Sequence, residues 1–106
     1  MKSKLNKIFQ FYGAKHQLKK LKEEHKEVAK AIKEYEYIRR RENDLAWILA
    51  KREHVAEEIA DCFNVLGEFM VAYGIPCEKV KEIMTEKQDR QLWRMQKELE
   101  NKSKWI

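Results

Sequence analysis

Residues 39–44 read Arg-Arg-Arg-Glu-Asn-Asp, a short polar run between two long stretches with helical periodicity. The first stretch covers about Ala14 to Arg40. The second stretch begins after Asn43 or Asp44, either of which can cap a helix, and continues to about Tyr73. We therefore predict a long antiparallel helix hairpin that turns within the polar run.

Glycine and proline mark the ends of the remaining helices. Gly13 separates the hairpin from a short N-terminal helix over about Lys4 to Tyr12. The Gly74-Ile75-Pro76 segment combines a helix stop with a helix start, and it predicts a fourth helix from about Pro76 to Glu100. No segment shows sustained period-two alternation, so the predicted fold class is all-α, a helical bundle built on the hairpin.

Each long helix carries an apolar stripe that we expect to form the seam of the hairpin. On the first helix the stripe consists of Leu18, Leu21, His25, Val28, Ile32 and Tyr35. On the second helix it consists of Leu45, Ile48, Leu49, Val55, Ile59, Phe63, Leu66 and Met70. Acidic residues flank both stripes, and we expect them at the edge of the seam.

Two acid pairs lie at mirrored positions on the predicted hairpin. Glu24 and Glu27 share one face of the first helix, and Glu58 and Asp61 share one face of the second. A turn midway between the pairs sets Glu24 opposite Asp61 and Glu27 opposite Glu58. Converging carboxylates repel one another unless cations neutralise them, and oxygen-only ligands favour Mg²⁺ or Mn²⁺. The pattern predicts a divalent-metal site between the two helices.

Two other interpretations of these acids have to be weighed. Ordinary surface glutamates pair with lysines one helical turn away, and that explanation needs no metal. A di-iron bundle, in contrast, needs Glu-x-x-His motifs. Lysines at positions 22 and 51 stand where His25 and His54 would need a glutamate, so neither histidine completes such a motif.

The composition limits the remaining possibilities. The chain has 106 residues, which suits one domain over residues 1–106, and 39% of them are charged. No apolar run approaches the roughly 20 residues of a membrane span, and Cys62 and Cys77 are isolated, so we expect a cytoplasmic protein without a membrane segment. The net charge of +5 comes from basic residues interleaved with glutamates along the whole chain, which argues against nucleic acid as the main partner.

The acid motifs and their neighbours resemble those of the MazG-like, all-α nucleoside triphosphate pyrophosphohydrolases. The resemblance rests on Glu23-Glu24-His25-Lys26-Glu27-Val28 and Glu57-Glu58-Ile59-Ala60-Asp61, and it extends to Gln17 and Leu18, to Tyr73-Gly74-Ile75 and to Lys87-x-x-Arg90. Together these segments cover about Ile8 to Arg94. The stretch between Glu27 and Glu58 is long for the compact members, which leaves substrate identity and assembly open.

The resemblance implies an enzyme that uses Mg²⁺ to hydrolyse a (deoxy)nucleoside triphosphate to the monophosphate and pyrophosphate, acting as a homodimer or homotetramer. It implies that the metal is bound by Glu24, Glu27, Glu58 and Asp61. Glu23 and Glu24 are the implied catalytic residues, with Glu23 holding or deprotonating the attacking water. Lys87 and Arg90 match basic residues that can meet phosphate oxygens.

Two further residues are candidates for substrate binding. Asn64, one helical turn beyond Asp61, can hydrogen-bond a sugar or base, or simply serve as a polar seam residue. Trp93, near Lys87 and Arg90, can stack on a base or belong to the core or a subunit interface. The alternative to an enzyme is a non-catalytic helical interaction protein, with nucleic acid as one conceivable partner, in which the acids only form surface ion pairs.

Overall fold

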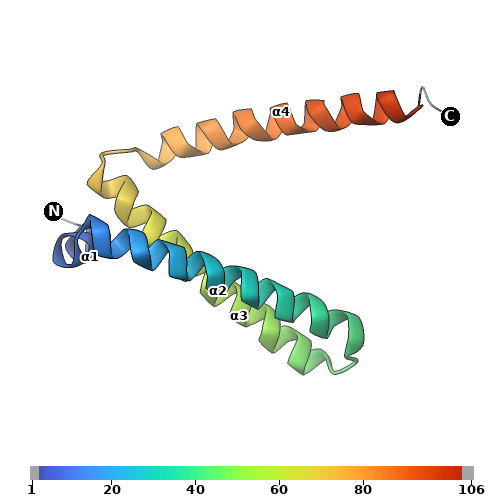
Figure 1. The fold of residues 1–106 in the computed structure, drawn as a ribbon, viewed down its shortest axis with the longest axis horizontal. Coiled ribbons are helices and arrows are strands. Elements are labelled where there is room, and N and C mark those ends of the chain that lie inside the picture. The colour runs from blue at the N-terminus through green and yellow to red at the C-terminus, as the bar shows by residue number, and fades with distance from the viewer. Residues whose placement is uncertain (1–2, 104–106) are drawn as a thin grey trace. The chain divides into compact units, whose positions relative to one another are not determined.

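The computed structural model describes residues 3–103, and this part of the chain forms four helices and no strand (Figure 1). The helices are α1 (Lys4–Tyr12), α2 (Ala14–Arg41), α3 (Leu45–Ala72) and α4 (Cys77–Ser103). The predicted all-α fold class is confirmed, and each predicted boundary lies within one helical turn of the observed one. Within the described residues, no helix has a stretch long and apolar enough to cross a membrane.

Local capping explains where the helices begin. The Ser3 hydroxyl accepts a hydrogen bond of 3.1 Å from the backbone N–H of Asn6 at the start of α1. The Asp44 carboxylate accepts one of 3.0 Å from the backbone N–H of Ala46 at the start of α3. Gly13, between α1 and α2, has a φ of 84°, which glycine adopts without steric cost. Residues 42–44 are the whole connection between α2 and α3.

Helices α1 to α3 form one compact unit that ends at Tyr73, and α4 belongs to a second unit that starts at Gly74. Within the first unit α2 and α3 lie side by side and antiparallel, as predicted, and α1 packs on the end of the hairpin where α2 begins (Figure 1). Phe9 of α1 meets Phe69 of α3 edge to face, with 5.2 Å between the ring centroids. The expectation of one domain over residues 1–106 stays a prediction.

Most seam positions of the hairpin follow a three–four alternation on both helices. The buried and half-buried positions of α2 include Gln17, Leu21, Glu24, Val28, Ala31, Tyr35 and Ile38. Those of α3 include Ile48, Lys51, Val55, Glu58, Cys62, Val65, Phe69 and Ala72. This is the spacing of the a and d positions of a coiled coil. The hairpin is therefore a coiled-coil-like pair whose seam contains charged and polar residues.

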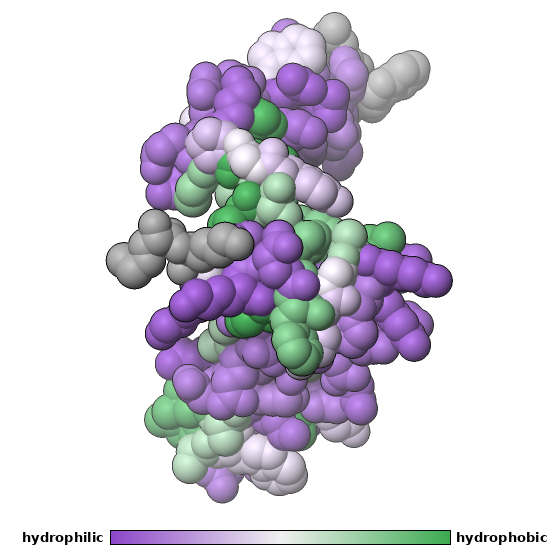
Figure 2. All heavy atoms as spheres, turned by 90° about the vertical axis from the view of Figure 1, so that its left-hand side faces the viewer, coloured by the Kyte–Doolittle hydropathy of each residue, from purple (hydrophilic) through white to green (hydrophobic). Residues whose placement is uncertain are grey.

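Part of the predicted apolar stripes lies outside this seam, so the predicted seam was wrong in detail. Leu18 and Ile32 of α2 are 49% and 42% exposed, and Phe63 of α3 is 68% exposed. The predicted stripe and the observed seam of α2 have the same spacing, but the seam uses the preceding residue at three positions, Gln17, Glu24 and Ala31. Glu24 is consequently only 7% exposed and lies in the seam, not at its edge. Figure 2 shows apolar side chains at the surface between charged ones.

Candidate active site

Three of the predicted metal ligands converge where α2 and α3 face each other. Glu24 of α2, Glu58 of α3 and Asp61 of α3 each offer a carboxylate oxygen, and these oxygens lie within 4.8 Å of one another. We call these three residues the acid cluster. Glu24 is buried, Glu58 is half-buried and Asp61 is exposed, so the cluster leads from the seam to the surface.

The chemistry of the acid cluster fits a hard divalent cation. All three donors are carboxylate oxygens, the ligand type that Mg²⁺ and Mn²⁺ prefer. Magnesium–oxygen distances of about 2.1 Å place opposite ligands of an octahedron roughly 4.2 Å apart, so small side-chain rotations suffice to bring these oxygens around one ion. A carboxylate as buried as Glu24 also requires a positive partner, because an unpaired buried charge is strongly destabilising.

Glu27 lies outside the acid cluster. It follows Glu24 by one turn on α2, and its side chain is exposed. The pairing also differs from the mirrored arrangement expected from the sequence, because Glu24 lies close to both Glu58 and Asp61. The role of Glu27 as a fourth metal ligand therefore stays a prediction.

Lys20 provides the positive partner of Glu24 in this structure. Its Nζ lies 2.9 Å from Glu24 Oε1, one helical turn earlier on α2. The hydrogen bond to Glu24 and the charge of Glu24 raise the pKa of Lys20, partial burial opposes them, and Glu23 and Asp61 add smaller attractive contributions. The negative charges of the acids thus attract the lysine ammonium, although the Lys20 side chain is 46% exposed.

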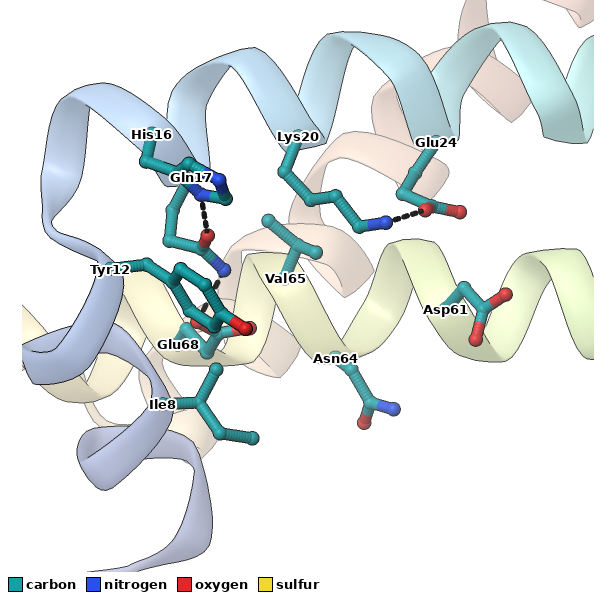
Figure 3. Close-up of a pocket in the computed structure, with 10 residues that line it drawn as sticks. All are labelled: Ile8, Tyr12, His16, Gln17, Lys20, Glu24, Asp61, Asn64, Val65 and Glu68. Carbon is teal, nitrogen blue, oxygen red and sulfur yellow. Dashed lines mark hydrogen bonds and ion pairs between the residues drawn. The ribbon is translucent and has the colours of Figure 1, made fainter.

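A pocket of about 420 Å³ adjoins the acid cluster. It is lined by Ile8, Tyr12, His16, Gln17, Lys20, Glu24, Asp61, Asn64, Val65 and Glu68. Figure 3 shows Glu24 and Asp61 at one end of the pocket and Tyr12, His16, Gln17 and Glu68 at the other. All of these lining residues belong to α1, α2 and α3, in the first compact unit.

A chain of hydrogen bonds forms the end of the pocket remote from the acid cluster. Gln17 Nε2 donates to Glu68 Oε1 at 2.8 Å, and both residues are only 3% exposed. This bond leaves Gln17 Oε1 as an acceptor, 2.7 Å from His16 Nδ1, so Nδ1 carries the proton of that bond. The His16 ring stacks on Tyr12 with 4.6 Å between centroids. A flat aromatic surface and fixed polar groups therefore lie side by side.

Sequence reasoning missed several residues of this pocket. Lys20 is one helical turn before Glu24, the spacing of a helical ion pair, and that signal was available. Glu68 lies two turns beyond Asp61 and one turn beyond Val65 along the same face of α3. Its burial could not be deduced, because the apolar stripe pointed to a different face of the helix.

The other predicted site residues have different surroundings. Asn64 lines the pocket, whereas Glu23 is exposed and is not among the lining residues. Lys87, Arg90 and Trp93 are exposed on α4, in the second compact unit. Their roles, and the catalytic role of Glu23, stay predictions.

His54 approaches the acid cluster from within α3. Its Nε2 lies 3.8 Å from Glu58 Oε1, and its Nδ1 lies 3.7 Å from Glu57 Oε2. Both contacts are longer than a hydrogen bond, so the histidine is a neighbour of Glu58 and not a member of the cluster.

The all-α fold and the acid cluster beside a pocket are features of the nucleotide pyrophosphohydrolase class. Residues 2–88 match the family model described as phosphoribosyl-ATP pyrophosphohydrolase. The chain belongs to this family, and with it to the MazG-like all-α superfamily predicted from the motifs. Membership supports a hydrolase that acts as a pyrophosphohydrolase on a nucleotide derivative. No curated protein and no solved structure gave a significant match.

The matched region contains the whole acid cluster and all residues that line the pocket. Lys87 lies just inside it, and Arg90 and Trp93 lie beyond it. The family match therefore bears on the hairpin more directly than on the second half of α4.

Proposed function

We propose that this protein is a Mg²⁺-dependent pyrophosphohydrolase that converts a (deoxy)nucleoside triphosphate to the monophosphate and pyrophosphate. The observation that carries the proposal is the acid cluster of Glu24, Glu58 and Asp61 beside a pocket, in a chain of this family. Mn²⁺ is the alternative ion, because it accepts the same oxygen ligands.

The acid cluster would hold the metal ion, with Glu27 as a further ligand on the adjacent turn. When bound, Mg²⁺ neutralises the carboxylates, binds phosphate oxygens and lowers the pKa of a water molecule. Glu23 is our candidate for orienting or deprotonating the attacking water. In support, the charge of Glu23 contributes to the raised pKa of Lys20, although less than Glu24 does.

The two ends of the pocket suggest how a nucleotide would lie. Its phosphates belong at the acid cluster, because a cation bound there makes that end attractive to an anion. Its base and sugar then reach toward the stacked rings of Tyr12 and His16 and the amide of Gln17. Asn64, between the two ends, can hydrogen-bond the sugar or the base. Lys87, Arg90 and Trp93 remain proposed substrate contacts from α4.

A second candidate substrate is phosphoribosyl-ATP, because the matched family carries that name. It contains the same triphosphate, so hydrolysis would again release pyrophosphate. The same acid cluster would serve both substrates. A site for one substrate would differ from a site for the other in the residues around the base.

The experiment that tests the function is a pyrophosphate-release screen with Mg²⁺. It covers the ribo- and deoxynucleoside triphosphates together with phosphoribosyl-ATP, and a parallel series contains EDTA. Turnover that EDTA abolishes supports the proposal and identifies the substrate. No turnover with any of them, together with no Mg²⁺-induced rise in melting temperature, favours the non-catalytic interaction protein.

We further propose that the protein acts as a homodimer or homotetramer in the cytoplasm. The support for assembly is the apolar surface beside the seam, where Leu18, Ile32, Phe63 and Leu66 are all at least two-fifths exposed, from 42% to 68%. Large apolar side chains exposed in this number on a small chain are typical of a protein interface.

A further inference from the structure

Lys20 occupies the position of a counter-ion in the acid cluster. Its Nζ donates to an oxygen of Glu24, the most deeply buried of the three acids, at 2.9 Å. Figure 3 shows this contact on the pocket side of α2, with the lysine side chain extended along the pocket toward Glu24. A divalent ion at the cluster would need the same carboxylate, so the ammonium and the ion compete for it.

The exposure of the two partners differs in a way that permits exchange. The Glu24 side chain is 9% exposed and is held in the seam, whereas the Lys20 side chain is 46% exposed. A flexible lysine stem can move its ammonium by several ångströms at small cost, and a buried carboxylate cannot follow. When the cation arrives, Lys20 is therefore the partner that moves.

Because Lys20 lines the pocket, its ammonium can still reach a ligand there after it leaves Glu24. Lys20 lines the same pocket as Asp61 and Asn64, and the polar chain of Gln17 and Glu68 closes its far end. A substrate anion bound in this pocket would give the displaced ammonium a new partner. The phosphate chain of a nucleotide is such an anion.

We infer that Lys20 is an exchangeable counter-ion, which pairs with Glu24 in the metal-free protein and transfers to a substrate phosphate when metal is bound. This inference rests on the proposed function, because it requires a metal at the acid cluster. It makes Lys20 a positioning residue that links metal occupancy to anion binding. The link is reciprocal, since two ligands that affect one element must affect each other's affinity equally.

The inference predicts opposite effects of one substitution on two ligands. Lys20→Met removes the competitor for Glu24, so free Mn²⁺ should bind roughly three- to tenfold more tightly than to the wild-type protein. The same substitution removes the phosphate partner, and we expect this loss to outweigh the gain at Glu24, so the preformed complex of Mn²⁺ with inorganic tripolyphosphate should bind more weakly. A lysine with a purely structural role would change both affinities in the same direction.

Isothermal titration calorimetry with MnCl₂ alone and with Mn²⁺–tripolyphosphate measures both affinities. Lys19→Met is the matched control, because Lys19 is an exposed lysine on α2 that does not line the pocket. It should stay within about twofold of the wild type for both ligands. Lys20→Arg keeps the positive charge, so its affinities for Mn²⁺ and for Mn²⁺–tripolyphosphate should rank as they do in the wild type. Circular dichroism checks the fold, and Lys20→Gln replaces Lys20→Met if the latter does not fold.

The outcomes separate the inference from the function on which it rests. If the wild-type protein binds no Mn²⁺, the proposed metal site fails and the role of Lys20 fails with it. If the wild type binds Mn²⁺ but Lys20→Met behaves like Lys19→Met, or shifts both ligands in the same direction, the counter-ion role alone is overturned. Tighter Mn²⁺ and weaker Mn²⁺–tripolyphosphate together support it.

Discussion

Glu68 of α3 accepts a hydrogen bond of 2.8 Å from the side-chain amide of Gln17 of α2, and both residues are only 3% exposed. A carboxylate this deeply buried is tolerated because the amide N–H replaces part of its lost hydration. The bond joins the two helices through two buried side chains, so it limits how far one helix can slide along the other. It therefore helps to fix the alignment of α2 against α3, and with it the position of Glu24 relative to Glu58.

Breaking this bond on one side should destabilise the protein. Gln17→Leu leaves the Glu68 carboxylate buried without its donor, which should lower the free energy of unfolding by about 2 kcal/mol. Gln10→Leu, at an exposed position of α1, is the control and should change it by less than about 0.5 kcal/mol. Urea denaturation of the wild type and of both variants measures these free energies of unfolding.

The same experiment tests whether the two residues act together. Glu68→Leu in the Gln17→Leu background removes the uncompensated carboxylate, so the double variant should be more stable than Gln17→Leu alone. If the two substitutions instead lower the free energy of unfolding additively, the hydrogen bond is not the reason why the buried carboxylate is tolerated.

The positions of the helices could be predicted from the sequence because the signals are local. Two of these signals are glycines with positive φ, Gly13 and Gly74, and the third is the capping residue Asp44. All three lie at observed helix boundaries. The convergence of Glu24, Glu58 and Asp61 was also predictable, since it follows from spacing and from the position of the turn.

The face of each helix that forms the seam could not be predicted in the same way. Hydrophobicity favours the face with Leu18 and Ile32, and the hairpin instead buries Gln17, Glu24 and Ala31. The small side chain of Ala31 lets the helices approach closely, and the polar residues are accepted because each finds a partner across or along the seam. Such pairing depends on two helices at once, so no pattern within one helix reports it.

Removing one carboxylate of the acid cluster should abolish the activity. Glu58→Gln keeps the size of the side chain but takes away a negative metal ligand, so we expect pyrophosphate release to fall by on the order of a hundredfold or more. Glu57→Gln is the control, because Glu57 is the adjacent, more exposed glutamate. Its rate should stay within about threefold of the wild type.

A second measurement on the same variants separates a lost metal from a damaged fold. Mg²⁺ or Mn²⁺ should raise the melting temperature of the wild type and of Glu57→Gln by mass action, and should do so less for Glu58→Gln. Unchanged activity of Glu58→Gln would remove Glu58 from the site.

The hairpin tip should show a pH-dependent stabilisation from Glu36. Its Oε2 lies 2.9 Å from Arg39 Nη2 and 3.3 Å from Arg40 Nη2. The hydrogen bond from Arg39 lowers the pKa of Glu36, burial opposes this shift, and the charges of Arg39 and Arg40 add to it. A carboxyl with a lowered pKa in the folded state stabilises that state above its ordinary pKa. The stabilisation is lost as the pH falls through the lowered value.

Glu36→Gln tests this dependence. The variant should melt slightly below the wild type at neutral pH, by no more than about 2 °C, because the pair is exposed. The difference should vanish below the lowered pKa of Glu36, where the wild-type carboxyl is protonated. Glu53→Gln, at an exposed position of α3, should show no such convergence. A difference that persists at low pH would mean that the side chain stabilises the tip by packing and not by charge.

Assembly should depend on Phe63, which is 68% exposed on α3, one turn before the exposed Leu66. A phenylalanine at the centre of an interface loses its contact with water on association, and a glutamate in its place would leave a buried charge without a partner. Phe63→Glu should therefore weaken self-association by at least about tenfold, which light scattering over a concentration series measures as a shift toward the monomer mass. Phe11→Glu is the matched control, because Phe11 is 81% exposed on α1, outside the hairpin. A wild-type protein that is monomeric at every concentration, or equal masses for Phe63→Glu and the wild type, would show that this apolar face does not hold subunits together.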